Sequence, residues 1–521
     1  MKESDGTSNS FADKENNESR AVLGVGSRLA AGPAKELVQT AFARELSDQL
    51  SLFKGMSLAD IAHTIMLIEV GVIPTADGAA LLSALLDLHE FPHDFTPIPE
   101  SGDLYTNREV WLASRTSAVG WLGAGRARRE STTTAYRITV RSYLLAFADA
   151  LIKDARALIE RADEYRSTLM ADYTYLQPAQ PTTFGHYLLA FAYPLLRDLE
   201  RLQALYGRTN RSPAGCGSVN GSHFPQDRNR LAELLGFDGL VQHGRDAMWQ
   251  PDGPIETLSV IVTALVNLDR LAEDLQIFAT AEFDLVELDE GHSRASVIMP
   301  QKKNPYALNY VRGATNELTG TLASAAALGR TPSGQVDNRV FIYGDVPRAL
   351  EMATGVANLM AGVLTGLRFN ASVALARLAN GFAMATDLAE TITLETGLDF
   401  RTAHRIVGRL VRDATQSNRT MSDLTAEDLD AVAQGMLNRP LQLSEAVFAQ
   451  ALDPATAIAA RQGIGGAAPE PLAAMLAECR TTLDAYTSWQ KQSTASAEAA
   501  EEALLRHTRN FVEEYHARPS H

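Results

Sequence analysis

The chain has 521 residues, of which 45% are hydrophobic and 21% charged, and its mean hydropathy is -0.11. This length suffices for about three domains of roughly 150 residues each, so a single small binding module is excluded. The net charge of -16, from 47 basic and 63 acidic residues, would repel phosphate backbones and anionic lipids. We therefore expect neither nucleic acid nor a membrane as a partner, and an anionic small molecule would need a local basic pocket.

Three features of the sequence indicate where the protein works. Cys216 and Cys479 are too few for a disulfide framework and form no CxxC motif, which fits a reducing cytoplasm. Residues 1–20 mix charged residues with Ser and Asn and lack the apolar core of a signal peptide, so they are predicted to form a mobile tail. The apolar stretches are interrupted well short of the ~20 residues that cross a bilayer, so no transmembrane segment is predicted.

Helical periodicity dominates the rest of the chain. We assign residues 21–124 to an N-terminal helical domain, in which an apolar-periodic region is closed by the Pro- and His-bearing segment 89–103. Apolar residues then recur every three or four positions in long stretches that begin near residue 137, after Pro181 and after Pro254. These stretches predict a central bundle of long helices over 125–375.

The chain after this bundle contains shorter helical stretches. Residues 376–521 are predicted to form a C-terminal helical domain with a turn-rich connector at 463–471 and an Ala- and Glu-rich helix over 493–515. No comparably long stretch alternates with period two. The predicted fold class is therefore all-α.

Residues 293–305, SRASVIMPQKKNP, are unlike any core helix. The segment contains a hydroxyl group, two adjacent lysines and an amide, and Pro305 is favoured in the first turn of a following helix. A carboxylate bound there would meet helix-start N–H groups, a lysine charge and the Asn304 amide. A lone lysine pair usually marks a solvated loop, but the whole string predicts an anion-binding site.

Four passages carry a resemblance to a known family. SVIMPQKKNP resembles the signature of the aspartase/fumarase superfamily, and MPQKKNP is similar to argininosuccinate lyases in particular. GRARRES at 125–131, YTYLQPAQP at 173–181 and SPAGCGSVNGSHFPQDR at 212–228 are similar to further family segments in the same order. The resemblance implies a three-domain, nearly all-helical subunit that assembles into a homotetramer, with each active site drawn from three chains. It also implies β-elimination from a small anionic succinyl dicarboxylate, with fumarate as product and with no metal or organic cofactor.

The resemblance implies a role for each matching residue. Ser296 is the base in its ionised form, and Lys302 with Asn304 stabilises the dianionic aci-carboxylate that forms when the carbon next to a carboxylate loses its proton. A serine is a poor base in water, so a nearby cation and desolvation would have to lower its pKa. Tyr175 stands at the position of the catalytic acid. The implied substrate-binding residues are Thr174, Asn304, Arg128, Arg129, Gln177, Met299 and Asn309.

Three arginines near the start of the first long helix have two possible roles. Arg126, Arg128 and Arg129 could supply the basic pocket that an acidic protein needs for an anionic ligand. Alternatively, Arg126 and Arg137 form ion pairs on the bundle surface, where each pair contributes only ~0–1 kcal/mol.

The departures from the family lie at the site. Tyr175 replaces the histidine of the family's YTHLQ segment, and Asn309 replaces the glutamate that orients this histidine. Arg129 and Glu130 replace the asparagine and aspartate of GRSRND. A tyrosine, with a reference pKa of about 10, holds its proton more tightly than a histidine does, so these changes argue against argininosuccinate as the substrate.

Two mechanisms remain open on the leaving-group side. Either Tyr175 protonates a strongly basic departing amine, which we favour, or the departing group is a stable anion such as nitrite that needs no acid. The sequence therefore predicts a carbon–nitrogen lyase that releases fumarate from an N-substituted aspartate or a related succinyl compound. The alternatives are a carboxymuconate-type cycloisomerase and a catalytically silent, crystallin-like structural relative.

Overall fold

The computed structural model describes residues 28–248, 251–331 and 339–517, so the tail predicted at residues 1–20 lies outside the described residues. The predicted all-α fold is confirmed, because helices make up most of the described chain and its six short strands pair only two by two. The α-helices are α2 Lys35–Leu37, α3 Ala43–Gln49, α4 Phe53–Glu69, α5 Thr75–Glu90, α6 Leu104–Ala113, α7 Arg128–Glu164, α8 Phe184–Thr209, α9 Arg228–Leu234, α10 Gly244–Met248, α11 Asp252–Phe278, α12 Tyr306–Leu328, α13 Arg339–Gly366, α14 Ala371–Asn380, α15 Ala385–Thr396, α16 Phe400–Gln416, α17 Ala426–Leu437, α18 Glu445–Ala451, α19 Pro454–Ala459 and α20 Pro469–His516. The strands are β1 Leu169–Thr174, β2 Gln177–Thr183, β3 Val286–Glu287, β4 Arg294–Ala295, β5 Lys303–Asn304 and β6 Arg368–Phe369. Short 3-10 or π turns are η1 Val38–Phe42, η2 Leu50–Leu52, η3 Pro92–Asp94, η4 Pro99–Ser101, η5 Ser117–Trp121, η6 Glu290–His292 and η7 Met421–Asp423.

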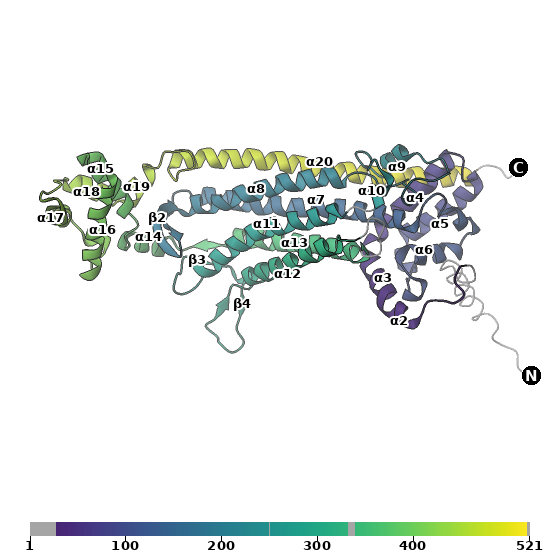
Figure 1. Ribbon diagram of the computed structural model, residues 1–521, viewed down its shortest axis with the longest axis horizontal. Coiled ribbons are helices and arrows are strands. Elements are labelled where there is room, and N and C mark those ends of the chain that lie inside the picture. Colours follow the sequence, from purple (N-terminus) through teal and green to yellow (C-terminus); the bar gives the residue numbers. More distant parts are fainter. Residues whose placement is uncertain (1–27, 249–250, 332–338, 518–521) are drawn as a thin grey trace, which may run out of the picture.

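Five long helices, α7, α8, α11, α12 and α13, lie side by side along the long axis of the molecule (Figure 1). Helix α7 packs against α8 and α13, and α11 packs against α8, α12 and α13. The apolar residues of α11 recur every three or four positions and therefore fall on one stripe of the helix. On this stripe Leu258, Ile261, Leu265 and Leu268 are at most 1% exposed, which confirms the periodicity predicted from the sequence.

A close contact at one end of the bundle fixes the hairpin of β1 and β2. Helix α8 begins after Thr183, whose hydroxyl accepts a hydrogen bond from the backbone N–H of His186 at 3.0 Å. A Cβ atom at Gly185 would overlap the carbonyl oxygen of Ala162 near the end of α7. Only glycine lets α8 start this close to α7, and the intervening chain forms the β1–β2 hairpin beyond both helix ends.

The N-terminal helices contain one run, Lys35–Glu69, that is long and apolar enough to cross a membrane. However, 78% of its apolar window is buried inside the protein, near the N-terminus of the described chain. The run includes α4, which packs against α5 and α7. It is therefore packed as a core helix of a soluble protein is.

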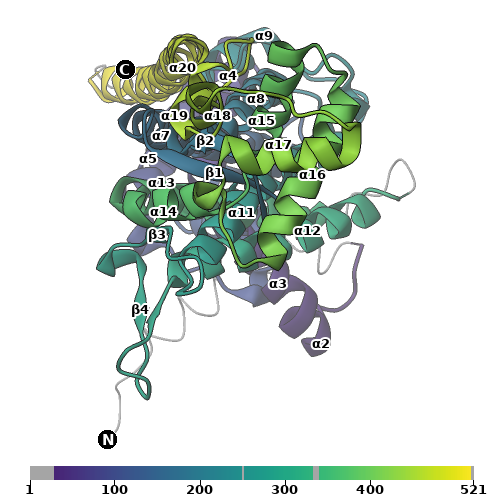
Figure 2. The same cartoon turned by 90° about the vertical axis from the view of Figure 1, so that its left-hand side faces the viewer.

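The region predicted as a C-terminal domain, residues 376–521, is divided between two hydrophobic cores. Helices α15 to α18 gather at the end of the bundle far from the N-terminal helices (Figures 1 and 2), and their apolar side chains form a second core. Helix α20 runs back along the whole bundle, and its Leu472, Leu476, Leu483 and Leu504 join the main core. The domain boundaries at 125 and 375 remain predictions.

Candidate active site

The segment that carries Ser296 is a projecting hairpin. Strands β4 and β5 pair antiparallel, with Arg294 opposite Asn304, and the loop between them stands away from the bundle in both views (Figures 1 and 2). The Ser296 hydroxyl accepts a hydrogen bond from the backbone N–H of Met299 at 3.0 Å, and the backbone N–H of Lys302 donates to the Met299 carbonyl at 3.0 Å. The loop is therefore held by its own hydrogen bonds.

The side chains of this hairpin differ in their contacts and in their exposure. The Asn304 amide donates to the carbonyl of Arg294 at 2.9 Å across the hairpin. Lys303 pairs with Glu287 at 2.8 Å, whereas the neighbouring Lys302 is exposed. Asn309 is exposed on the first turn of α12, immediately after the hairpin. The structure thus brings Ser296, Met299, Lys302, Asn304 and Asn309 into one local segment.

Tyr175 lies at the tip of the other hairpin, in a strained turn. Thr174 pairs with Gln177, and the two residues between them have positive φ angles, 54° at Tyr175 and 58° at Leu176. Positive φ at both central residues is the pattern of a type I′ turn, which favours Asn-Gly, so a Tyr-Leu pair costs about 1–2 kcal/mol per residue. Tyr175 is 99% exposed and Leu176 51% exposed. This backbone holds the phenol out from the protein, and strained turns of this kind cluster at functional sites.

Arg128 and Arg129 lie at the beginning of α7 but differ in how accessible their side chains are to a ligand. Arg129 forms an ion pair with Glu45 at 2.6 Å, with side chains 13% and 12% exposed. The Arg128 side chain is 47% exposed and lies 3.5 Å from Asp103. Residue Ala127 at the N-cap gives α7 no side-chain cap, so the helix N-terminus also favours an anion here. Of the two predicted arginines, Arg128 is the more accessible to a carboxylate.

Arg126 belongs to a buried ion cluster. Its Nη2 lies 2.5 Å from Asp60, and the other carboxylate oxygen of Asp60 accepts from Arg108 at 2.9 Å. The side chains of Asp60 and Arg108 are 0% exposed and that of Arg126 2% exposed. The expectation that Arg126 forms part of a substrate pocket is therefore wrong, as is the alternative of a surface ion pair. The sequence did contain a signal for this buried cluster, because Asp60 is a carboxylate within the otherwise apolar sequence of α4.

Glu130 anchors the loop that follows α8. Its carboxylate accepts a hydrogen bond from the backbone N–H of Gly215 at 2.8 Å, within segment 212–228. The carboxylate also lies beside Gly217 and Cys216 of the same loop, and the residue is 2% exposed. Burial raises the pKa of Glu130 to about 7, against hydrogen bonding from Gly215 and the charge of Arg126, which lower it. The sequence marked Glu130 as a changed residue but did not predict this anchoring role.

The raised pKa of Glu130 predicts a pH-dependent stability. Because the folded protein binds this proton more tightly than the unfolded chain, whose Glu pKa is about 4.3, the contribution is fully present below pH ~4.3 and is lost as pH rises through 7. The loss amounts to about 3 kcal/mol. Glu130→Gln removes the titration, so its free energy of unfolding relative to the original protein should rise between pH 5 and pH 8. Denaturant unfolding at matched protein concentration measures this difference, and a flat difference would contradict the assignment.

One chain does not bring all predicted site residues together. Helix α7 has 37 residues and is therefore about 55 Å long. Arg128 and Arg129 lie at its start, whereas Thr174, Tyr175 and Gln177 follow its end. A small dicarboxylate cannot contact both groups in the same chain.

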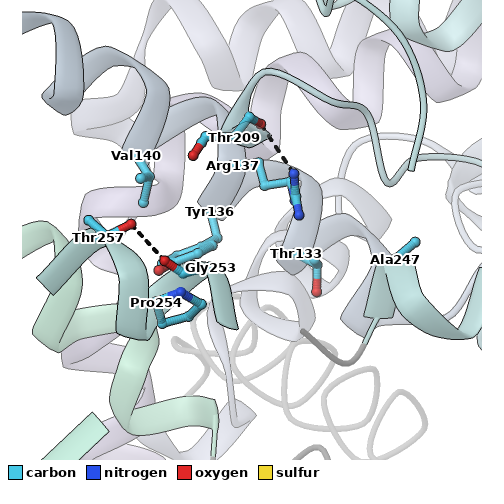
Figure 3. A pocket seen from close by; sticks show the side chains of 9 residues that line it. All are labelled: Thr133, Tyr136, Arg137, Val140, Thr209, Ala247, Gly253, Pro254 and Thr257. Carbon is cyan, nitrogen blue, oxygen red and sulfur yellow. Dashed lines mark hydrogen bonds between the residues drawn. The ribbon is translucent and has the colours of Figure 1, made fainter. Parts of the chain in front are cut away.

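Two cavities of the described chain lie elsewhere. The one in Figure 3 is lined by α7, α8, α10 and α11, and its volume of about 30 Å³ has room for about two water molecules. Arg137 lies beside it and donates to the Thr209 carbonyl at 3.2 Å. A larger cavity of about 560 Å³ lies between α4, α7 and α20. None of the predicted site residues lines either cavity.

Comparisons with known proteins agree with the resemblance. A family profile described as lyase matches residues 106–320, and a profile described as argininosuccinate lyase C-terminal matches residues 382–459. The argininosuccinate lyase of Methanothrix thermoacetophila is 35% identical over 455 residues, covering 86% of this chain and 91% of that relative.

Solved structures are similar over most of the chain. A variant of EDDS lyase with bound fumarate has a TM-score of 0.85 and 27% identity, and the match covers 94% of this chain and 98% of that one. The 3-carboxy-cis,cis-muconate lactonizing enzyme from Pseudomonas putida has a TM-score of 0.66 and 19% identity, covers 84% of this chain and 95% of that one, and shares the fold alone. The chain therefore belongs to the argininosuccinate lyase-like branch of the aspartase/fumarase superfamily and is a carbon–nitrogen lyase of that type.

Proposed function

We propose that the protein eliminates an amine from an N-substituted aspartate other than argininosuccinate and releases fumarate. The observation that carries the proposal is that one group of site residues matches the family and the other does not. The residues that concern the future fumarate, Ser296, Lys302, Asn304 and Thr174, match the family, whereas the leaving-group residues Tyr175 and Asn309 do not. The likeness to EDDS lyase with bound fumarate, at 27% identity, supports both halves of this proposal.

The reaction begins with removal of a proton from the carbon next to a carboxylate. Ionised Ser296 takes this proton, and the electron pair moves into the carboxylate to give the dianionic aci form. Lys302 and the amide of Asn304 supply positive charge and a donor where the second charge develops. The electrons then form the carbon–carbon double bond of fumarate, and the carbon–nitrogen bond breaks with its electron pair leaving on nitrogen.

The departing nitrogen needs a proton if the amine is strongly basic. Tyr175 supplies that proton from its phenol, and Asn309 stands where the family has the glutamate that orients the histidine. An exposed phenol on a strained turn supports this role, because the turn presents Tyr175 to a ligand held by another segment. A leaving group that departs as a stable anion would need no proton from Tyr175.

The proposed active site is completed by other copies of the chain in a cytoplasmic homotetramer. The length of α7, about 55 Å, separates Arg128 from Tyr175 within one chain. Val297 and Ile298 at the tip of the Ser296 loop are 107% and 84% exposed, and such exposed apolar tips favour burial against a second copy. Three segments from three chains would surround one substrate, with no metal or organic cofactor in the proposed chemistry.

The proposal is tested by incubating the protein with a panel of N-succinyl amines, including argininosuccinate, and following the ultraviolet absorbance of fumarate. The reverse reaction is followed with fumarate and a matching panel of amines. We expect turnover of one or more N-substituted aspartates at a kcat/KM well above that for argininosuccinate. Argininosuccinate as the best substrate would refute the proposed substrate, and no turnover in either direction would refute fumarate release.

The role of Tyr175 has its own expected result. Tyr175→Phe keeps the ring and the backbone strain but removes the phenol proton, so kcat for a strongly basic leaving amine should fall by about 10²-fold or more. For a leaving group that departs as a stable anion, kcat should change little. Tyr515→Phe, at the end of α20, is the matched control and should leave both rates unchanged. Equal rates for Tyr175→Phe and the original protein on a basic amine would show that Tyr175 is not the acid.

A further inference from the structure

The Ser296 hairpin projects from the bundle, so its direction depends on how its base is held (Figures 1 and 2). At this base, the turn Glu290–His292 follows β3 and leads directly into β4. We propose that Asp289 and His292 position the Ser296 hairpin by docking its base on two glycines of α13. This inference rests on the proposed function, because it assigns these residues a role in placing the base for proton abstraction.

Asp289 and His292 form a compact pair. The Asp289 carboxylate accepts two hydrogen bonds from His292, one from the backbone N–H at 3.0 Å and one from ring Nδ1 at 2.6 Å. The Ser293 hydroxyl donates to the Asp289 carbonyl at 2.7 Å, immediately before β4. The side chains of Asp289 and His292 are 41% and 23% exposed, so the pair lies at the surface and against the bundle. Together these bonds fix the turn from which the hairpin leaves.

Helix α13 meets this pair at two residues one turn apart that lack side chains. A Cβ atom at Gly362 would lie 2.6 Å from His292 Nε2. A Cβ atom at Gly366 would overlap the Asp289 carboxylate. Glycine is unfavourable inside a helix relative to alanine, and at these two positions the close approach of the pair gives a reason for it. Gly355 on the same helix has no atom within 4 Å of its added Cβ, so it does not share this role.

A second tether holds the other limb of the hairpin. Lys303 in β5 pairs with Glu287 in β3 at 2.8 Å, and Glu287 also pairs with Arg368 in β6 at 3.2 Å. Strand β6 follows directly after α13 and pairs with β3. Both limbs of the hairpin therefore make contacts near the end of α13, the second limb through ion pairs at the surface. Misplacement of a reacting group by about 1 Å can cost about 10²-fold in rate, so these contacts would affect catalysis through the position of Ser296.

The test compares Gly366→Ala with Gly355→Ala on a substrate found in the panel. We expect Gly366→Ala to lower kcat by about 10- to 100-fold with KM changed less than about threefold, because the ligand contacts survive while the base is displaced. Gly355→Ala should leave kcat and KM unchanged and should raise the melting temperature slightly, because alanine is favoured over glycine in an exposed helix. A second pair separates hydrogen bonding from bulk: His292→Ala should lower kcat similarly, and His292→Asn, which keeps a donor for Asp289, should recover most of the rate.

Hydrogen–deuterium exchange gives a readout that does not need turnover. In Gly366→Ala the amides of residues 286–304 should exchange faster than in the original protein, and in Gly355→Ala they should not. Unchanged exchange and unchanged kcat in Gly366→Ala, or an equal loss in Gly355→Ala, would overturn the proposed docking. If the original protein releases no fumarate at all, the proposed function fails, while the exchange comparison still decides whether Gly366 holds the base of the hairpin.

Discussion

Replacing Ser296 with alanine is expected to lower kcat for fumarate release by about 10²- to 10⁴-fold, the usual contribution of a general base. The activation free energy would rise by about 3–5 kcal/mol. The physical reason is that no other group of the hairpin can remove the proton, since Lys302 and Asn304 serve as donors. Initial rates measured by fumarate absorbance at saturating substrate give this value.

Fumarate affinity separates the loss of the base from a general collapse of the loop. The Ser296 hydroxyl also accepts a hydrogen bond from the backbone N–H of Met299 at 3.0 Å, so substitution by alanine removes one hydrogen bond that orders the loop. If Lys302 and Asn304 still bind the carboxylates, the dissociation constant of fumarate in Ser296→Ala should change by less than about threefold, because the charged and amide donors of the hairpin are retained. Retention of kcat in this variant would show that Ser296 is not the base.

Replacing Asp60 with asparagine is expected to lower the free energy of unfolding by about 3–5 kcal/mol. The carboxylate lies between Arg108, at 2.9 Å, and Arg126, at 2.5 Å, and all three side chains are almost fully buried. Removing its charge leaves two buried guanidinium groups without a counter-charge, which is far more costly than losing an exposed pair. Urea unfolding at a fixed protein concentration measures the change.

An exposed ion pair of the same protein is the control for Asp60. Glu273 pairs with Arg312 at 2.9 Å, but the side chains are 51% and 36% exposed. Glu273→Gln should therefore change the free energy of unfolding by no more than about 1 kcal/mol. Equal changes in the two variants would mean that the Asp60 cluster contributes no more than a surface ion pair.

Local patterns were sufficient to predict the long helices and the two irregular segments to which we assign the chemistry. The apolar residues of α11 recur with the helical period, and the structure buries them as that period requires. The string from Ser293 to Pro305 breaks this period and ends at a proline, so a loop followed by a helix was predictable there. Sequence could not predict that α20 returns along the bundle, because an Ala- and Glu-rich helix carries little information about its partner.

The sequence by itself was enough to predict the helical architecture and the family, and it is the source of the proposed roles of Ser296, Lys302 and Tyr175, because periodicity and short motifs depend only on neighbours along the chain. The tertiary structure decided which charges are available to a ligand. Arg126 and Arg129 are three residues apart, yet folding pairs the first with Asp60 and the second with Glu45, which lie 66 and 84 residues away along the chain. Arg128 between them keeps a side chain that is 47% exposed. Burial and charge pairing come from contacts between distant segments, and no local pattern in the sequence specifies them.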